Sequence, residues 1–113
     1  MAHAKGTYNA LTRRWMKRNG WDFDGAEKFS KYGMFARDLF NFIDFVALSS
    51  KDGIIGVQST SSANHSARKK KILASHRAIN WLKAGGLIVV ISWRKVESRW
   101  IHKAEYITVS DFE

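Results

Sequence analysis

The sequence predicts an α/β fold, with residues 1–113 forming a single domain in which a central mixed β-sheet is flanked by helices in the order αβββαβ. Helical patterns of apolar residues at 6–19 and 67–84 enclose a run of strand-like segments. Within that run, an Asp-Gly turn at 52–53 joins two apolar segments into a hairpin. The apolar segment 87–93 directly follows the second helix, which is typical of a β-α-β crossover between parallel strands.

The first helix is expected over 6–19, where apolar residues recur at spacings of three and four and an Asn-Gly pair ends the pattern. Segment 21–29 alternates aromatic and acidic residues, which predicts a half-exposed strand with a bulge at Gly25. The polar segment 30–37 is expected to be a loop.

The central hairpin is expected to have strands at 42–48 and 54–57, joined by a polar turn and followed by the polar residues 58–60. Asp44 interrupts the apolar run of the first of these strands. A buried carboxylate is costly unless it meets a cation, hydrogen-bond donors or a metal ion. Asp44 is therefore the first candidate for a functional residue.

After the hairpin, Ser62 or Asn64 is expected to cap one long helix over 67–84, which a Gly-Gly pair ends. The strand 87–93 is almost wholly apolar, as expected for a strand that is covered on both faces. The aromatic and β-branched residues between 100 and 109 predict one last strand or hairpin.

The composition excludes several classes of protein. An apolar fraction of 45% favours a folded core, and the absence of cysteine excludes disulfides, cysteine-based zinc sites and a thiol nucleophile. The four histidines show no metal-ligand spacing. No apolar run approaches the ~18 residues that a membrane span needs, and the N-terminus lacks the apolar core of a secretory signal. We expect a cytoplasmic protein with no membrane partner.

The charge favours a polyanionic partner. Nineteen Lys and Arg against ten Asp and Glu give a formal net charge of +9, and nucleic acid is the first candidate. The alternative is a basic surface that only aids solubility. The residues expected to contact phosphates lie on the first helix and at the start of the second, where four consecutive cations span all faces: Arg13, Arg14 and Lys17, then Arg68, Lys69, Lys70 and Lys71.

With this element order, the chain resembles the PD-(D/E)xK nuclease superfamily, in particular the small Holliday junction resolvases and related phage and bacterial nuclease-like domains. The matching segments are 6–9, 42–47 and 56–60. In that family an Asp lies on the strand where Asp44 lies, an acid-x-Lys motif ends the next strand, and a Glu is common in the first helix. This chain keeps the Asp and has Asn9, Gln58 and Thr60 at the other positions.

The resemblance implies a restriction-endonuclease-like core that hydrolyses phosphodiester bonds of DNA, including branched DNA, with Mg²⁺ or Mn²⁺, and that forms a homodimer. It implies that Asp44, Gln58 and the carbonyl of Ser59 hold the metal ion. Thr60 then stands at the position of the catalytic lysine, whose role passes to Arg68 or Lys69 or is dispensed with.

A further acid would strengthen this weakly charged site, and two are available. Glu27, on the neighbouring strand, is the better candidate for a catalytic role. Asp38 is six residues before Asp44, about 20 Å away on an unbroken strand. That distance excludes Asp38 as a ligand unless the chain turns around Phe40-Asn41.

Two other interpretations stay open. In the first, the domain is catalytically inactive and binds nucleic acid or a partner protein, with Asp44 paired to a cation and Gln58 as its hydrogen-bond partner. The isolated acid within an apolar strand favours the active alternative. In the second, Trp81, Trp93 and Trp100 form a homodimer surface, although burial in the core is the better explanation of these tryptophans.

Overall fold

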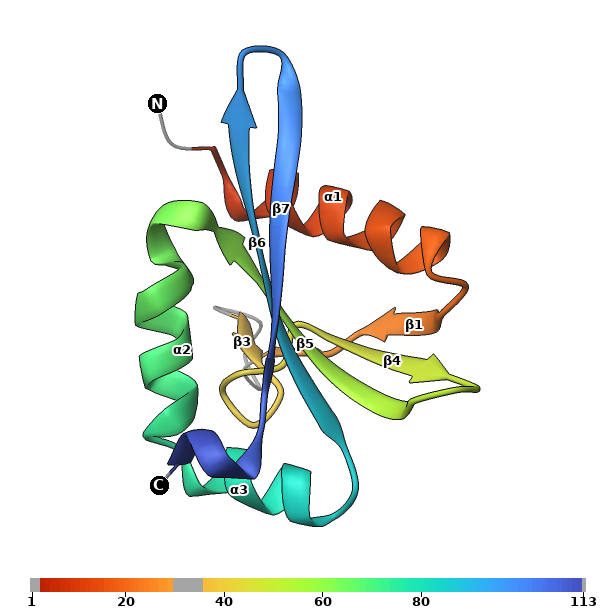
Figure 1. Cartoon of the computed structure of the whole chain (residues 1–113), viewed down its shortest axis with the longest axis vertical. Helices are drawn as coiled ribbons and strands as arrows, with labels where there is room; N and C mark the ends of the chain where they lie inside the picture. The colour runs from red at the N-terminus through yellow and green to blue at the C-terminus, as the bar shows by residue number, and fades with distance from the viewer. Residues whose placement is uncertain (1–2, 30–35, 113) are drawn as a thin grey trace.

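The computed structural model describes residues 3–29 and 36–112, and the side chains of residues 27–37 lie outside what it describes. A five-stranded sheet has the order β1-β4-β5-β6-β7, and β2 and β3 form a separate two-stranded sheet (Figure 1). The helices are α1 (Lys5–Arg18), α2 (His65–Leu73) and α3 (His76–Lys83), with short 3-10 helices η1 (Ser62–Asn64) and η2 (Val109–Phe112). The strands are β1 (Asp22–Gly25), β2 (Glu27–Phe29), β3 (Ala36–Asp38), β4 (Phe45–Ser49), β5 (Gly53–Ser61), β6 (Leu87–Val96) and β7 (Arg99–Ile107).

The predicted α/β class with a central mixed sheet is confirmed. β5 and β6 pair in parallel, and the other neighbours in the five-stranded sheet pair antiparallel. The expected order αβββαβ runs through α1, β1, β4, β5, the α2–α3 segment and β6, and β7 extends the sheet at its edge. Helices α2 and α3 form the crossover that parallel strands require.

Side chains alternate between the two faces of the sheet and build a core on each side. On one face, α1 contributes Trp15 and Met16 to a cluster with alternate residues of β6 such as Val89 and Ile91. On the other face, Ile72 of α2 and Ala78 of α3 pack with Ile88 and Val90. Helix α1 therefore lies on the opposite side of the sheet from α2 and α3.

The prediction of a single helix over 67–84 is wrong, because Ala74 and Ser75 separate α2 from α3. Ser75 is extended, with φ −104° and ψ 118°, which stops the first helix and redirects the second. The change of direction lets α3 cover the amino end of β6, near Leu87 (Figure 1).

The strand expected over 21–29 is also divided. The amide of Ala26 donates to the carbonyl of Asp44 (2.8 Å), after which the chain leaves the five-stranded sheet and continues as β2. Residues 30–35 of the expected loop lie outside the described residues, and 36–38 form β3 rather than a loop.

The β6–β7 hairpin projects beyond the rest of the sheet (Figure 1). Its strands have ten and nine residues, and its outer part, 94–99, is exposed. Within the part of the chain that the structure describes, no helix is long and apolar enough to cross a membrane.

Candidate functional site

A tight turn between Asp38 and Asp44 builds the centre of the site. Phe40 and Asn41 take positive φ values of 53° and 70°. Reciprocal backbone hydrogen bonds of 3.0 Å between Leu39 and Ile43 close the turn. The strand expected from residue 42 therefore begins only at Phe45, and the chain makes the turn at Phe40-Asn41 that the sequence left as a condition.

This turn places the carboxyl group of Asp38 close enough to Asp44 to raise the pKa of Asp44. The separation of about 20 Å expected for an unbroken strand is therefore wrong. Local sequence gives little warning of the turn, because positive φ is unusual for a bulky residue such as Phe40.

The two carboxylate oxygens of Asp44 have different environments. Asp44 is only 2% exposed. Its Oδ2 accepts hydrogen bonds from Lys5 Nζ (3.0 Å), Gln58 Nε2 (2.7 Å) and the amide of Ser59 (2.8 Å). Its Oδ1 is buried and has no hydrogen-bond partner in the described part of the chain. A buried oxygen without a hydrogen-bond partner lowers the stability of the fold. Oδ1 is therefore available to bind a proton or a cation.

The environment of Asp44 raises its pKa from 3.8 to about 7. Burial is the largest cause, and the nearby carboxyl group of Asp38 adds to it, while the positive charge of Lys5 acts in the opposite direction. The raised pKa means that Asp44 readily takes up a proton near neutral pH unless a cation takes its place.

Lys5 supplies the positive charge of the site. Its ammonium group donates to Asp44 Oδ2 and to the backbone carbonyl of Ser59 (2.7 Å) from the first turn of α1. Sequence reasoning missed Lys5, and no spacing could reveal it, since it is 39 and 54 residues from these partners.

The two residues expected to take over the lysine role do not contact Asp44. Lys69 donates to Glu105 Oε2 (2.7 Å) on β7. Neither Lys69 nor Arg68 is among the hydrogen-bond partners of Asp44 in the described residues. The chain therefore brings a lysine to the site from a different element, the start of α1.

One face of α1 continues the site. Lys5, Asn9 and Thr12 are spaced by about one helical turn each. Thr12 Oγ1 bonds Ser59 Oγ (2.8 Å) and accepts from Trp93 Nε1 (2.9 Å), which fixes α1 against β5 and β6. Asn9, at the position where the resemblance implies a Glu, has a buried Oδ1 without a hydrogen-bond partner among the described residues.

Of the remaining residues expected at the site, some contact Asp44 and others do not. Gln58 and Ser59 contact Asp44, but Gln58 does so as a donor and Lys5 already occupies the carbonyl of Ser59. Thr60 is buried beside Ser92 of β6 and is not a hydrogen-bond partner of Asp44. The backbone of Glu27 pairs with that of Asp38, and its side chain lies outside the described residues.

These donors fit a single hard cation of modest affinity. Among the described residues there is no cluster of three or more His, Cys, Asp or Glu side chains. The available oxygens are Asp44 Oδ1, which has no partner among the described residues, and those of the adjacent Asp38 carboxyl group, and Mg²⁺ commonly binds one or two carboxylates and keeps several water molecules. The pair of aspartates therefore fits Mg²⁺ better than the expected set of Asp44, Gln58 and Ser59.

A second buried polar cluster lies on the α2 side of the sheet. His65 Nδ1 bonds Ser92 Oγ (2.6 Å), and His65 Nε2 bonds Glu105 Oε1 (2.8 Å), whose other oxygen accepts from Lys69. The hydrogen bonds with Lys69 and His65 lower the pKa of Glu105. The cluster joins α2 to β6 and β7, and each of its charged groups has a partner.

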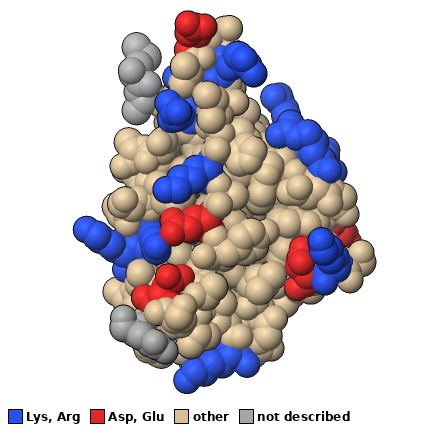
Figure 2. Space-filling model, viewed as in Figure 1, with Lys and Arg blue, Asp and Glu red and all other residues tan. Residues whose placement is uncertain are grey.

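The residues expected to contact phosphates do not form one surface. Arg13, Arg14 and Lys17 lie on α1, whereas residues 68–71 lie on α2, on the opposite side of the sheet. Arg13 packs its guanidinium over the Phe45 ring at 5.0 Å. Figure 2 shows Lys and Arg in separate groups on the visible face, with other residues between them.

The tryptophans do not form a common exposed face. Trp93 is 3% exposed and belongs to the core on the α1 side. Trp81 and Trp100 are half-buried and pack against the cores on opposite sides of the sheet. The expectation of a homodimer surface formed by all three is wrong in this respect.

Comparisons with protein families, with curated proteins and with solved structures found no match to this chain.

Proposed function

We propose that this protein is a metal-dependent DNA endonuclease that hydrolyses phosphodiester bonds of linear or branched DNA with Mg²⁺ or Mn²⁺. The observation that carries the proposal is the buried Asp44 beside the half-buried Asp38, with Asp44 Oδ1 unpartnered in the described part of the chain and the Lys5 ammonium on Oδ2. The resemblance to the PD-(D/E)xK superfamily and the net charge of +9 support it.

The residues divide the chemistry among them. Asp44 Oδ1 and the carboxyl group of Asp38 would hold the cation, which when bound polarises the phosphodiester and lowers the pKa of a water molecule. Lys5 holds the Asp44 carboxylate in place and adds positive charge close to where the phosphate would lie. Gln58 and the amide of Ser59 fix the orientation of Asp44.

The substrate would be bound mainly through its phosphates. Exposed basic residues occur on α1, on α2 and on the outer part of the β6–β7 hairpin, where Arg94, Lys95 and Arg99 lie. Cations on three separate elements suit a DNA molecule that is bent or branched better than a flat contact with a straight duplex.

A cleavage assay tests the proposal. Linear, flapped and four-way DNA are incubated with Mg²⁺, with Mn²⁺ or with a chelator, and the rates are compared for wild type, Asp44→Asn, Asp38→Asn and Lys5→Met. Because the metal ligands act on the transition state, we expect Asp44→Asn to lower cleavage at least about a hundredfold. Asp22→Asn, which removes an exposed carboxylate of β1, is the matched control.

Two results would contradict the proposal: no cleavage of any substrate by the wild type, or cleavage by Asp44→Asn at the wild-type rate.

One observation favours a second function, that of a nucleic-acid-binding domain without catalysis. The Lys5 ammonium already bridges Asp44 Oδ2 and the Ser59 carbonyl, so an internal cation partly compensates the charge of Asp44. This function predicts DNA affinity that falls with salt and that neither Mg²⁺ nor Asp44→Asn changes. Fluorescence anisotropy with labelled DNA distinguishes the two functions.

The homodimer that the resemblance implies is tested separately. Sedimentation velocity of the purified protein, with and without four-way DNA, measures its mass. A monomer at high micromolar concentration in both conditions would contradict a homodimer.

A further inference from the structure

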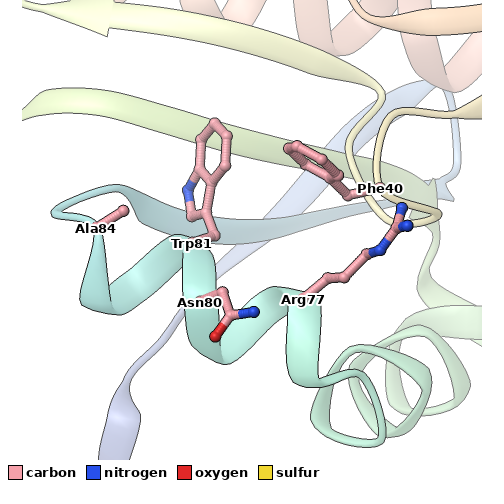
Figure 3. A pocket seen from close by; sticks show the side chains of 5 residues that line it. All are labelled: Phe40, Arg77, Asn80, Trp81 and Ala84. Atoms are coloured by element: carbon pink, nitrogen blue, oxygen red, sulfur yellow. The ribbon is translucent and has the colours of Figure 1, made fainter.

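A pocket of about 390 Å³ opens beside the turn that joins Asp38 to Asp44. It is lined by one residue of the turn and four residues of α3 and its end, namely Phe40, Arg77, Asn80, Trp81 and Ala84 (Figure 3). The four α3 positions are spaced by three and four residues, so they lie on one face of the helix. The volume is in the range of pockets for small organic ligands.

Phe40 is held at the mouth of this pocket by an unfavourable backbone. Its φ of 53° is rarely adopted by a bulky residue. The ring is 39% exposed, whereas the nearby Phe42 and Ile43 are buried in the core. Strained residues that expose a large apolar side chain need an explanation other than packing, and contact with a ligand is one.

The walls of the pocket suit a flat aromatic ligand. The rings of Phe40 and Trp81 meet edge to face, with centroids 6.2 Å apart, and Arg77 lies over the Phe40 ring at 5.7 Å. Figure 3 shows Arg77 reaching from α3 toward Phe40. Phenylalanine, tryptophan and arginine are the side chains on which nucleobases stack.

Contacts within the protein already fix the position of the Trp81 side chain. Its Nε1 donates to the carbonyl of Leu87 (2.8 Å), so its polar atom is occupied, and its ring also meets Phe42 edge to face with centroids 6.5 Å apart. Gly86 lies so close to the indole that a Cβ there would collide with it. The amide of Asn80 is the uncharged polar group of the wall, and an amide offers both a donor and an acceptor to the edge of a base.

The position of the pocket relates it to the proposed chemistry. Phe40 is two residues after Asp38 and four residues before Asp44, in the same closed turn. A base that entered the pocket would therefore lie beside the turn that joins the two aspartates. Among the described residues, the lining has one cation and no acid, which suits a polyanion rather than a basic peptide.

We propose that this pocket binds an unpaired nucleobase of the DNA substrate, so that the enzyme acts on DNA with a single-stranded or extruded nucleotide at the site of cleavage. The inference rests on the proposed function for its choice of DNA. It adds the substrate class, since bases in an intact duplex are stacked and cannot enter a side pocket without being extruded.

The test compares two single-stranded 12-mers with the same phosphates, one of thymidylate and one of abasic residues, by fluorescence anisotropy in a metal chelator. The wild type is expected to bind the base-bearing strand about tenfold more tightly. Phe40→Ala and Phe40→Leu should reduce this preference to less than about twofold and leave the abasic affinity unchanged. The leucine variant keeps an apolar side chain, so its effect reports on the aromatic ring.

Leu48→Ala is the matched control, because Leu48 is 51% exposed on β4 and does not line this pocket. It should retain the wild-type preference. Equal affinity of the wild type for both strands would overturn the proposal, as would Phe40 variants that weaken both strands equally. A wild-type dimer that Phe40→Ala converts to a monomer would also overturn it, since the pocket would then be an interface between copies.

Binding without metal separates this inference from the proposed function. A base preference that depends on Phe40, together with no cleavage by the wild type, would support base binding in the pocket and contradict the nuclease function. Cleavage that depends on Asp44, together with no base preference, would do the reverse.

Discussion

The two buried polar clusters on the sheet differ in how completely their hydrogen bonds are satisfied. Around His65, both ring nitrogens and both oxygens of Glu105 have partners. Around Asp44, one oxygen accepts three hydrogen bonds and the other accepts none.

Satisfied networks of buried polar groups fix one packing arrangement, whereas an unsatisfied group at a strained turn stores free energy that a ligand can release. We therefore expect a structural role for the cluster around His65 and a functional role for the cluster around Asp44. The effect of pH separates them in the same way, because the pKa of Asp44 is raised and that of Glu105 is lowered.

The largest expected effect on stability is the pH dependence due to Asp44. Its pKa is about 7 in the folded protein and about 3.9 in an unfolded chain, so the folded state binds the proton more tightly. This contribution to stability is fully present below about pH 4 and is lost as pH rises toward 7. Between pH 4 and 8, the free energy of unfolding of the wild type should fall by about 2 to 4 kcal/mol relative to Asp44→Asn.

Urea unfolding at a series of pH values measures this difference, with Asp22→Asn as a variant that should follow the wild type. If the free energies of unfolding of wild type and Asp44→Asn change with pH in parallel, Asp44 does not contribute the expected pH dependence and the two clusters do not differ in their response to pH. Glu105 has the opposite sign, since stability from its lowered pKa is present above the unfolded value and is lost as pH falls.

The next effect concerns His65. His65→Ala removes two buried hydrogen bonds and leaves Ser92 Oγ without its partner, which should cost about 2 to 3 kcal/mol of stability. Because the cluster is structural, DNA cleavage measured well below the unfolding temperature should stay within about twofold of the wild type. A loss of cleavage as large as that of Asp44→Asn, in a variant that remains folded, would abolish the distinction between the clusters.

The smallest effect is expected from single basic residues. Arg14→Ala on α1 and Lys71→Ala on α2 each remove one exposed cation. Each should lower DNA affinity a few-fold and reduce the salt slope of log affinity by about one. Because α1 and α2 lie on opposite sides of the sheet, a short duplex should respond to only one of these substitutions, and a four-way junction is expected to respond to both.

The sequence by itself determined the α/β class and the order of the main elements, and it indicated Asp44 as a candidate functional residue. Periodicity of apolar residues, an Asp-Gly turn and an apolar strand after a helix are local signals, and an acid within an apolar strand is equally visible. Local signals also indicated Gln58 and Ser59, which directly follow the apolar run of the third strand of the predicted core.

Only the tertiary structure decided which charged groups surround Asp44. Lys5 reaches it because α1 packs across the end of β5, and that packing depends on contacts between residues far apart in the chain. Asp38 reaches it because Phe40 and Asn41 adopt positive φ, which packing imposes against local preference. The site is therefore assembled from long-range contacts and one strained turn, and neither leaves a periodic signal in the sequence.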